Sequence, residues 1–511
     1  MFGWNHKQVL GWVSLFVAAV LPRALVAAED HAKPSSSTER PNFVFILVDD
    51  LRYDAMSCAG HPFVKTPNID RIATAGVRFT NAFVTLSLCA PSRAAFLTGI
   101  YNHANGIPTN EGQELDPSKF ATYPQRLQRA GYETAFIGKW HQGPTASPRP
   151  GFDYWLSFRG QGVYVDPQLN ENGREFKAQG YMTDLLTQAA VDFLKKPRNK
   201  PFSLCLWHKA VHGPFTPADR HKDLYRDVEL PEPPSFRDTF EGKPAWQRAL
   251  IRPGGKAKDV ANEPVPPAIP PEPWQPRDAA RLDYYRALAA VDDSVGRVLA
   301  TLKETGQLDN TVVIFAGDNG FFMGEHRRGD KRLAYEESLR IPLLMRGPGV
   351  AKPGSTRDQM VLNIDMAPTI LDMAGVKPGP GTQGRSFKAI LAGENPDWRK
   401  SFLFEYYQEG WLPRIPTLVG VRTTDWKYVT YPTIQDLDEL YDLRNDPHEM
   451  KNLAGDPAAR DRLEAMRAEL DRLKKETGYT LLQPSAGRRD NAASRPAQRR
   501  GKRAAPARER P

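Results

Sequence analysis

The segment Asn42-Phe43-Val44-Phe45-Ile46-Leu47-Val48-Asp49-Asp50 determines the architecture that the rest of the chain is expected to adopt. Its apolar run is continuous rather than alternating, which is typical of a strand buried on both faces of a parallel sheet. Two adjacent carboxylates follow the run, and α/β proteins place their ligands at that carboxyl edge of the sheet. The segment therefore predicts a central parallel strand that delivers Asp49 and Asp50 to a site.

The same pattern recurs along the chain: a helical segment precedes a short apolar strand, and polar residues follow the strand. The predicted helices cover residues 122–130, 184–194 and 277–304, and the predicted strands cover 131–141, 201–208 and 311–316. The polar residues at or after these strand ends include Lys139, His141, His208, Lys209, His212, Asp318 and Asn319. This alternation predicts an α/β sandwich in which helices cover both faces of a large, mostly parallel sheet.

The length and a change in composition predict a second, smaller domain. A chain of 511 residues exceeds a single typical core. Strands are predicted over 402–407, 418–422 and 426–431, and a helix over about 457–477. We therefore expect a large domain over 42–376, a linker over 377–395, and a C-terminal α+β domain with an antiparallel sheet over 396–484.

Residues 231–276 interrupt the alternation with twelve prolines and little periodicity. This composition predicts a long surface excursion of the large domain rather than a packed element. Such a loop could form a wall of a substrate cleft, or it could be a spacer. The sequence leaves both open.

The two ends of the chain differ from the rest. A positive start, an apolar run over 9–21 and small residues before Glu29 predict a signal peptide over 1–28, followed by a linker over 29–41. The run is short for a membrane span, although an uncleaved anchor is the alternative. We expect the mature protein to be exported, periplasmic or secreted, without stable membrane insertion. Residues 485–511 carry +7 of the net charge of +9, and their lack of large apolar side chains predicts a disordered basic tail. This tail could contact anionic polymers or membrane surfaces, but we expect a solvated tail and no nucleic-acid partner.

A second segment, residues 87–99, contains Cys89 two positions before Pro91 and four before Arg93. Pro91 suits the first turn of a helix, which places Cys89 at a helix N-terminus that favours an anion. A buried structural cysteine is the alternative. Three cysteines exclude a disulfide-built scaffold, and pairing of Cys58 with Cys205 stays open.

The strand-end residues suggest a metal site that binds a tetrahedral anion. Asp49, Asp50, Asp318 and Asn319 offer hard oxygen ligands, which fit Ca²⁺ or Mg²⁺. By itself, Asp49-Asp50 could be a helix cap or a turn, and Asp318-Asn319 could be a hairpin turn. The cationic and proton-transferring groups nearby are Lys139, His141, His208, Lys209, His212 and Lys331. A lone histidine is more often structural, but the combination favours a metal that holds an anion.

The segment from Cys89-Ala90-Pro91-Ser92-Arg93 to Gly99, and the segment 131–141, resemble the two signatures of the formylglycine-dependent sulfatases of the alkaline phosphatase superfamily. The resemblance covers about residues 41–453. It implies an alkaline phosphatase-like fold and a sulfuric ester hydrolase with one Ca²⁺ ion. It also implies that a maturation enzyme converts Cys89 to formylglycine (3-oxoalanine).

The resemblance implies a role for each matching residue. The implied calcium ligands are Asp49, Asp50, Asp318, Asn319 and the modified residue 89. Arg93 and Lys139 would stabilise the formylglycine hydrate, and His141 would be the base that breaks the covalent intermediate. His212 and Lys331 would bind the sulfate, and one of them would protonate the leaving alcohol.

The sequence says less about the part of the substrate that carries the sulfate group. The residues expected to contact that part are Arg52, Lys209, His326 and Arg328. Resemblance to N-acetylglucosamine-6-sulfatases and arylsulfatase-type bacterial enzymes implies a sulfated carbohydrate. The alternatives are a phosphonate or phosphodiester hydrolase of the same superfamily and a non-catalytic exported binding protein. The sugar, the sulfate position, endo or exo action and the oligomeric state stay open.

Overall fold

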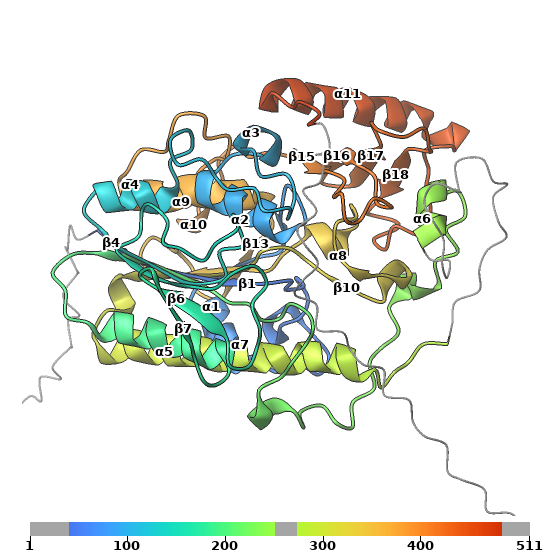
Figure 1. The fold of residues 1–511 in the computed structure, drawn as a ribbon. Coiled ribbons are helices and arrows are strands. Elements are labelled where there is room, and N and C mark those ends of the chain that lie inside the picture. The colour runs from blue at the N-terminus through green and yellow to red at the C-terminus, as the bar shows by residue number, and fades with distance from the viewer. Residues whose placement is uncertain (1–39, 251–272, 483–511) are drawn as a thin grey trace, which may run out of the picture. The chain divides into compact units, whose positions relative to one another are not determined.

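The computed structural model describes residues 40–250 and 273–482 (Figure 1). The predicted signal peptide, the linker up to residue 39 and the basic tail lie outside the described residues. Residues 251–272 of the proline-rich segment also lie outside them. Within the described ranges, no helix combines the length and the apolar character needed to cross a bilayer.

A ten-stranded sheet forms the centre, in the order β13-β2-β12-β9-β1-β8-β4-β5-β6-β7. β1 (Asn42–Val48) pairs in parallel with β8 (Phe202–Trp207) on one side and β9 (Thr311–Gly317) on the other. β4 (Glu133–Gly138) and β5 (Tyr154–Ser157) extend the parallel core beyond β8. The flanking strands are β2 (Val77–Phe79), β12 (Leu343–Arg346), β13 (Ser355–Arg357), β6 (Gln168–Glu171) and β7 (Arg174–Lys177). The predicted central parallel strand is confirmed.

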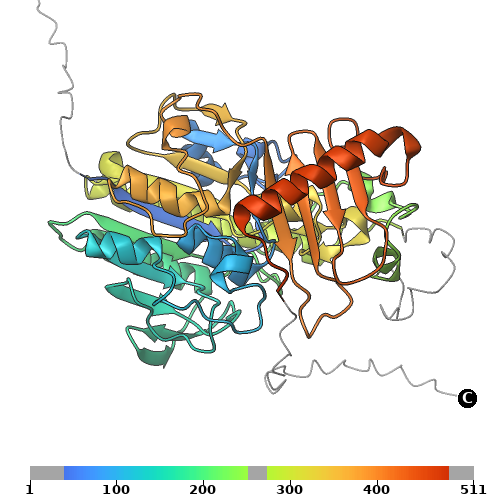
Figure 2. The ribbon, with the colours of Figure 1, turned by 90° about the horizontal axis from the view of Figure 1, so that it is seen from above.

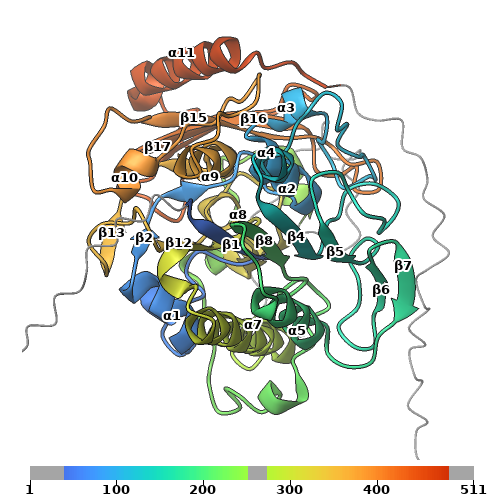
Figure 3. The same cartoon turned by 90° about the vertical axis from the view of Figure 1, so that its left-hand side faces the viewer.

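Helices cover both faces of this sheet (Figure 3). One face carries α1 (Pro67–Thr74), α5 (Met182–Lys195) and α7 (Ala279–Glu304). The other carries α2 (Cys89–Thr98), α4 (Tyr123–Arg129) and α9 (Met366–Met373). Alternate residues of β1 enter the two cores: Val44, Ile46 and Val48 belong to the first, and Phe43, Phe45 and Leu47 to the second. The continuous apolar run is thus explained, because both faces of β1 are buried.

Helix ends follow local chemistry. Thr122 and Gln125 form a capping box at the start of α4. Asp278 caps α7, so this helix begins two residues after the predicted start, because the Asp278 side chain accepts a hydrogen bond from the backbone N–H of Arg281. Cys89 is the first residue of α2, which confirms its predicted place at a helix N-terminus.

A separate four-stranded antiparallel sheet lies toward the C-terminus. It consists of β15 (Ser401–Tyr406), β16 (Leu418–Thr423), β17 (Trp426–Thr430) and β18 (Glu439–Asp442). α11 (Arg460–Thr477) runs across these strands (Figure 2). Its buried residues recur at helical spacing: Leu463, Met466, Leu470 and Leu473. The predicted α+β arrangement is confirmed, and the exact domain boundaries stay predictions.

Shorter elements complete the described chain. The short strands are β3 (Ala82–Phe83), β10 (Phe322–Met323), β11 (Gly329–Asp330) and β14 (Val361–Leu362). The short helices are α3 (Asn102–Asn105), α6 (Ala245–Leu250), α8 (Glu336–Leu339) and α10 (Lys388–Leu391). The 3-10 turns are η1 (Ser57–Ala59), η2 (Asp219–His221), η3 (Pro234–Arg237), η5 (Leu308–Asn310), η6 (Glu325–Arg327), η7 (Asn363–Asp365) and η8 (Pro457–Ala459).

The first part of the proline-rich segment corrects one prediction. Residues 231–250 contain η3 and α6, and both Phe240 and Lys243 are fully buried. Lys243 pairs with Asp238 at 2.5 Å and donates to the carbonyl oxygen of Glu449 at 2.7 Å. The expectation of an unpacked surface excursion is therefore wrong for this part. The buried Lys243–Asp238 pair contacts the rest of the protein through the Glu449 carbonyl oxygen and through His326 Nδ1, which lies 2.7 Å from Asp238 Oδ2.

Candidate active site

The ends of β1 and β9 bring the predicted oxygen ligands together. The two strands are parallel neighbours, so the residues that follow them share one edge of the sheet. The backbone N–H of Asp50 donates to Asp318 Oδ1 at 3.0 Å. The Asn319 side-chain amide donates to Asp50 Oδ1 at 2.8 Å. All of these side chains are buried, and Asp49 completes the group.

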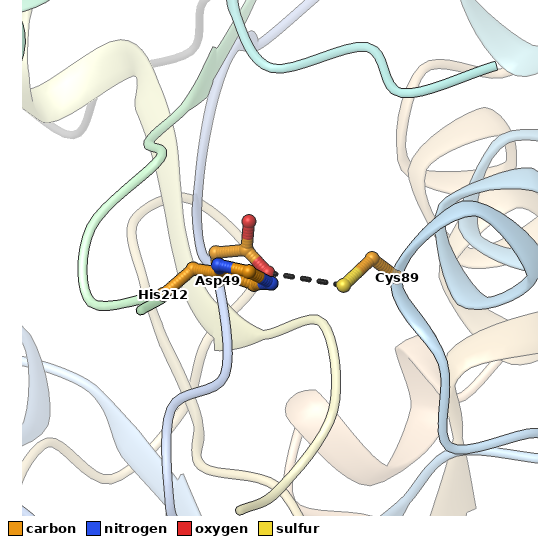
Figure 4. A group of neighbouring side chains, drawn as sticks. All are labelled: Asp49, Cys89 and His212. Carbon is orange, nitrogen blue, oxygen red and sulfur yellow. Dashed lines mark hydrogen bonds between the residues drawn. The ribbon is translucent and has the colours of Figure 1, made fainter. Parts of the chain in front are cut away.

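Cys89 faces this group from the first turn of α2 (Figure 4). Its Sγ lies 3.3 Å from Asp49 Oδ1 and 3.0 Å from Lys331 Nζ. Burial, with a contribution from Asp49, raises the pKa of the Cys89 thiol far above its ordinary value. The thiol is therefore protonated at neutral pH, and it is a poor nucleophile as it stands.

Three buried cations pair with the three carboxylates. Lys139 contacts Asp49, and Lys331 contacts Asp50. Arg93 Nε donates a hydrogen bond to Asp318 Oδ2 at 2.8 Å, and a terminal nitrogen of Arg93 forms an ion pair with the same oxygen at 2.7 Å. Buried charges of this kind persist only when they are paired or bound.

The carboxyl groups of Asp49 and Asp318 have pKa values that are shifted in opposite directions. Burial by itself would raise the pKa of Asp49, but Lys139, His212 and Arg93 outweigh burial and hold it well below its ordinary value. Burial and the neighbouring Asp49 raise the pKa of Asp318 to about 7, against the effect of Arg93. An added positive charge would lower the pKa of Asp318 again and favour its carboxylate form.

These residues fit a hard divalent cation. Carboxylate oxygens of Asp49, Asp50 and Asp318 all lie within 4.8 Å of one another. Asn319 Oδ1 is buried and has no hydrogen-bond partner among the described residues. A cluster of oxygen donors with an unsatisfied amide oxygen suits Ca²⁺ or Mg²⁺ better than a metal that prefers thiolate or imidazole. Asp49, Asp50, Asp318 and Asn319 are thus brought together as predicted.

The Gln161 side chain, which was not predicted from the sequence, connects Lys139 to His141. Gln161 Oε1 accepts from Lys139 Nζ at 2.6 Å, and Gln161 Nε2 lies 3.1 Å from His141 Nε2. Burial and the charge of Lys139 lower the pKa of His141 well below its ordinary value, so its ring is neutral. Gln161 stands between Gly160 and Gly162, both in the left-handed region. A polar residue between two glycines was the available signal.

His212 lies beside Asp49 and faces Cys89 (Figure 4). Its side chain is 20% exposed, whereas that of Lys331 is 2% exposed. Nδ1 lies 2.7 Å from the carbonyl oxygen of Gly213, and Nε2 lies 3.7 Å from Asp50 Oδ2. Burial lowers the pKa of His212 to about 4, although Asp50 opposes this shift.

Of the four predicted substrate residues, Lys209 is the one whose pKa responds to the charges of Asp49 and Asp50. Its Nζ is buried, has no hydrogen-bond partner among the described residues and lies 4.6 Å from the centre of the Tyr164 ring. Burial and Lys139 lower the pKa of Lys209 to about 8. The preceding His208 instead contacts Ser294 of α7 at 3.2 Å, which is a structural position.

The other three predicted substrate residues contact different parts of the protein. Arg52 pairs with Asp54 and Glu325, and it lines a cavity of about 440 Å³ that none of the predicted catalytic residues lines. His326 is fully buried and stacks on Tyr335 at 3.8 Å between ring centres. Arg328 lies over the Phe240 ring. The structure does not place these side chains beside the cluster of Asp49, Asp50 and Asp318. Their roles in substrate recognition stay predictions.

All three cysteines are free, which answers the open question about Cys58 and Cys205. Cys205 lies in β8, and its Sγ is 3.0 Å from the hydroxyl of Tyr123. Cys58 is partly buried in η1. Neither contacts the group around Cys89, so of the three cysteines only Cys89 belongs to the site.

The fold and the site define an alkaline phosphatase-like hydrolase, and comparison with known proteins makes this specific. The sulfatase family model matches residues 41–376. A second model, described as N-sulphoglucosamine sulphohydrolase, C-terminal, matches residues 324–476. The chain belongs to the sulfatase family, and it is an enzyme that hydrolyses sulfate esters.

Individual relatives agree with this assignment. An N-acetylglucosamine-6-O-sulfatase of Bacteroides thetaiotaomicron is 36% identical over 488 residues, which cover 85% of this chain and 87% of the relative. A solved structure described as a complex with its substrate D-glucosamine-2-N,6-O-disulfate has 34% identity and a TM-score of 0.76, and the match covers 86% of this chain and 98% of that chain. A phosphonate monoester hydrolase of Agrobacterium radiobacter has a TM-score of 0.69 at 23% identity, over 87% of this chain and 98% of that chain. That last likeness shows the fold alone.

Proposed function

We propose that this sulfatase removes sulfate groups from sulfated carbohydrates, with a nucleophile made from Cys89 beside a bound Ca²⁺ ion. The observation that carries the proposal is the position of Cys89 Sγ. It is buried at a helix N-terminus, 3.3 Å from Asp49 Oδ1 and 3.0 Å from Lys331 Nζ. An atom at this position faces both the cation ligands and the charges that would hold a sulfate.

The high thiol pKa is the reason to propose that Cys89 is modified before it acts. Conversion to formylglycine is a two-electron oxidation, in which water supplies the aldehyde oxygen and sulfur leaves as sulfide. A separate maturation enzyme would provide the oxidant, such as dioxygen. When present, the hydrated aldehyde supplies one hydroxyl as nucleophile and a second hydroxyl whose deprotonation allows sulfate to be released by C–O cleavage.

The cations around residue 89 supply the electrostatic stabilisation. A sulfate ester carries negative charge that shifts between its oxygens during displacement, so fixed positive charges lower the barrier. Lys331 lies directly beside residue 89, while Lys139 and Arg93 compensate the carboxylates. A Ca²⁺ ion held by Asp49, Asp50, Asp318 and Asn319 would add positive charge and lower the pKa of a bound hydroxyl.

The two histidines would divide the proton transfers. His141 is neutral, and its Nδ1 is buried without a hydrogen-bond partner among the described residues, so it can accept a proton from a hydroxyl on residue 89. The His212 side chain is partly exposed, so it can hand a proton from Nε2 to the leaving oxygen. A bound sulfate ester adds negative charge near His212 and thereby opposes the lowering of its pKa by burial.

The substrate class rests on the relatives and on charge. The Bacteroides thetaiotaomicron relative is named N-acetylglucosamine-6-O-sulfatase, and the solved neighbour holds a disulfated glucosamine. Lys209 Nζ lacks a hydrogen-bond partner among the described residues, so it is available for a further anionic group of such a substrate. Export by a signal peptide over 1–28 is part of the same proposal, because sulfated polysaccharides are extracellular.

A desulfation screen with enzyme from the native host tests the proposal. The substrates are N-acetylglucosamine-6-sulfate, N-sulfated glucosamine, defined sulfated oligosaccharides, and matched phosphate monoesters and diesters. We expect the highest kcat/KM on a sulfated sugar and formylglycine at residue 89 by peptide mass spectrometry. A dominant phosphodiester rate would refute the sulfated-carbohydrate assignment. Unmodified thiol in a fully active enzyme would refute the modified nucleophile.

A further inference from the structure

Trp411 is exposed to a degree that requires an explanation. Among the large apolar side chains of the described residues it has the highest exposed fraction, 59%. A single exposed apolar residue is ordinary on a protein surface, and exposure alone indicates no function. Trp411 differs because its ring is held in a fixed orientation and because its loop contacts both segments that carry catalytic residues.

The ring is held from two directions. The indole N–H donates to Glu409 Oε1 at 3.1 Å, and Glu409 is fully buried. The guanidinium of Arg332 lies 5.1 Å from the ring centre and covers part of the indole. Arg332 in turn donates from Nε to Glu409 Oε2 at 2.5 Å. The indole is therefore presented to solvent in one orientation before any ligand arrives, which lowers the entropy cost of binding.

The loop of Trp411 is joined to the Lys331 segment on one side. Arg332, which covers the indole, directly follows Lys331 in the chain. Asp330, which precedes Lys331, pairs with Arg332, and its side chain is 50% exposed. Asp330 and Arg332, which are linked to the Trp411 loop, thus flank in the chain the residue whose Nζ lies 3.0 Å from Cys89 Sγ.

The same loop is joined to the Cys89 segment on the other side. The backbone N–H of Gly410 donates to the Glu111 carboxylate at 2.5 Å. The neighbouring Asn110 side chain accepts from the backbone N–H of Ala90 at 2.9 Å. Trp411 is therefore one residue from a contact with the turn that holds the N-terminus of α2. Its position is fixed relative to both reacting segments.

From these contacts we infer that Trp411 is the platform on which a sugar ring of the substrate lies while the ester sulfate occupies the space beside residue 89 and Lys331. This inference rests on the proposed function. One face of a pyranose consists largely of C–H groups, which pack on an indole, while its hydroxyls need polar partners at the edge. Asp330, which is 50% exposed and pairs with the Arg332 that covers the indole, can provide such a partner. The ring on Trp411 is either the sulfated sugar itself or its neighbour in an oligosaccharide.

The test compares Trp411→Ala and Trp411→Phe with Leu437→Ala, which removes another exposed side chain (51%) near the C-terminal sheet. The substrates are N-acetylglucosamine-6-sulfate and a disaccharide that carries the same sulfated sugar. Loss of an aromatic contact predicts about a tenfold fall in kcat/KM for Trp411→Ala, mainly through KM. Trp411→Phe keeps a ring and should recover most of this loss. Leu437→Ala should match the wild type.

Inhibition by inorganic sulfate separates the sugar contact from damage to the sulfate position. If Trp411 contacts only the sugar, the inhibition constant of sulfate stays the same in Trp411→Ala. A loss on both substrates identifies the sulfated ring as the one on Trp411, and a loss on the disaccharide alone identifies its neighbour. Equal weakening of sulfate inhibition and sugar turnover would overturn the inference, as would wild-type kinetics of Trp411→Ala on every sugar.

The proposed function can fail separately. Wild-type enzyme that turns over aryl sulfates and no sulfated sugar would refute the substrate class, and the platform with it. A direct measurement supports the kinetics: in the inactive Cys89→Ala variant, saturating sulfated disaccharide should protect Trp411 from oxidation by N-bromosuccinimide. An unchanged oxidation rate of the Trp411 peptide at saturation, measured by mass spectrometry, would overturn the inference.

Discussion

Two regions of this protein bury charged groups equally well but use them differently. At the ends of β1 and β9, Asp49 and Asp318 are fully buried and face Cys89, Arg93 and Lys139. In a second region, Asp238 and Lys243 are also buried and paired, but they contact His326 and Tyr335. Burial of charge therefore does not mark an active site by itself. Convergence at the carboxyl ends of neighbouring parallel strands does.

The second region joins parts of the chain that are distant in sequence. Lys427 of β17 pairs with Glu336 at 3.0 Å and with Glu449 at 2.7 Å. Lys243 joins Asp238 to the carbonyl oxygen of Glu449. These pairs connect the proline-rich segment, α8 and the C-terminal sheet. Loss of a strand-end residue should therefore reduce catalysis, whereas loss of a residue in the second region should reduce stability.

The largest expected effect is that of Cys89→Ala. Without a side chain that can become the nucleophile, turnover should fall by about 10⁴-fold or more. The circular dichroism spectrum and calcium binding should stay close to those of the wild type, since the Asp and Asn ligands remain. Cys58→Ala, at a partly buried cysteine outside the site, is the control and should keep full activity.

Cys89→Ser sharpens the same test. A serine can accept the sulfate group but has no second hydroxyl to expel it, so at most one turnover per enzyme is expected. Pre-steady-state measurement of released alcohol would show a burst of up to one equivalent followed by a stalled enzyme. Multiple turnovers at the wild-type rate would contradict the proposed role of the formylglycine hydrate.

The next largest effect is expected on removal of the cation. Asp318→Ala deletes one ligand and the nearest carboxylate partner of Arg93, so kcat/KM should fall at least about a hundredfold. Chelation of the wild-type enzyme should give a similar loss that added Ca²⁺ reverses. Metal analysis should find one Ca²⁺ per wild-type chain and less in Asp318→Ala. A metal-free wild-type enzyme with full activity would show that the carboxylate cluster serves only structure.

His212→Ala should have a smaller effect that depends on the substrate. If His212 protonates the leaving oxygen, the loss should be about a hundredfold or more on sugar sulfates, whose alcohols leave poorly. It should be much smaller on an activated aryl sulfate. His208→Ala is the matched control, because His208 contacts Ser294 rather than the carboxylate group, and it should affect both substrates alike. Equal losses for His212→Ala on both substrates would remove the acid role.

The parts of the site that could be predicted from the sequence lie directly after apolar strands. Asp49, Lys139 and Asp318 follow β1, β4 and β9, and strand order in a parallel sheet brings such residues together whatever the intervening loops do. Gln161 could not be predicted in the same way. It contacts Lys139 and His141 from a loop whose path depends on Gly160 and Gly162, and no periodic pattern marks that path.

His326 and Arg328 were predicted from the sequence to bind substrate, but the structure places their side chains away from the carboxylate cluster. Their nearness to Lys331 in the chain suggested a role in substrate binding, but the backbone between them and Lys331 changes direction. His326, Arg327 and Asp330 all have positive φ angles. Their partners come from residues 238–247, which the sequence suggested to be unpacked. The burial of Lys243 beside Asp238 depends on tertiary contacts that local composition does not encode.

The smallest expected effect concerns the pH dependence of stability and tests the structural role of the second region. Burial and Lys243 lower the pKa of His326 to about 3, whereas an unfolded histidine has a pKa of about 6.5. Between these values the unfolded chain binds a proton that the native protein does not. This difference lowers the free energy of unfolding by up to about 1.4 kcal/mol per pH unit as the pH falls below 6.5. His326→Gln should remove that slope, as measured by urea unfolding at pH 6.5 and 4.5, and should leave KM unchanged.

His103 is the matched control, because its pKa moves in the opposite direction. Its hydrogen bond to Glu405, 2.9 Å from Nδ1, raises the pKa of His103 although burial opposes the shift. The native protein then holds a proton that the unfolded chain loses first as the pH rises, so His103 stabilises the fold at low pH and less at high pH. The slope due to His103 therefore lies above pH 6.5, because below that value the histidine is protonated in both states. His103→Gln should leave the slope between pH 6.5 and 4.5 unchanged and reduce the fall in stability above pH 6.5, whereas His326→Gln makes the slope in the lower window shallower. An unchanged lower-window slope in His326→Gln would contradict a neutral buried His326, and a raised KM in His326→Gln would return this residue to the substrate site.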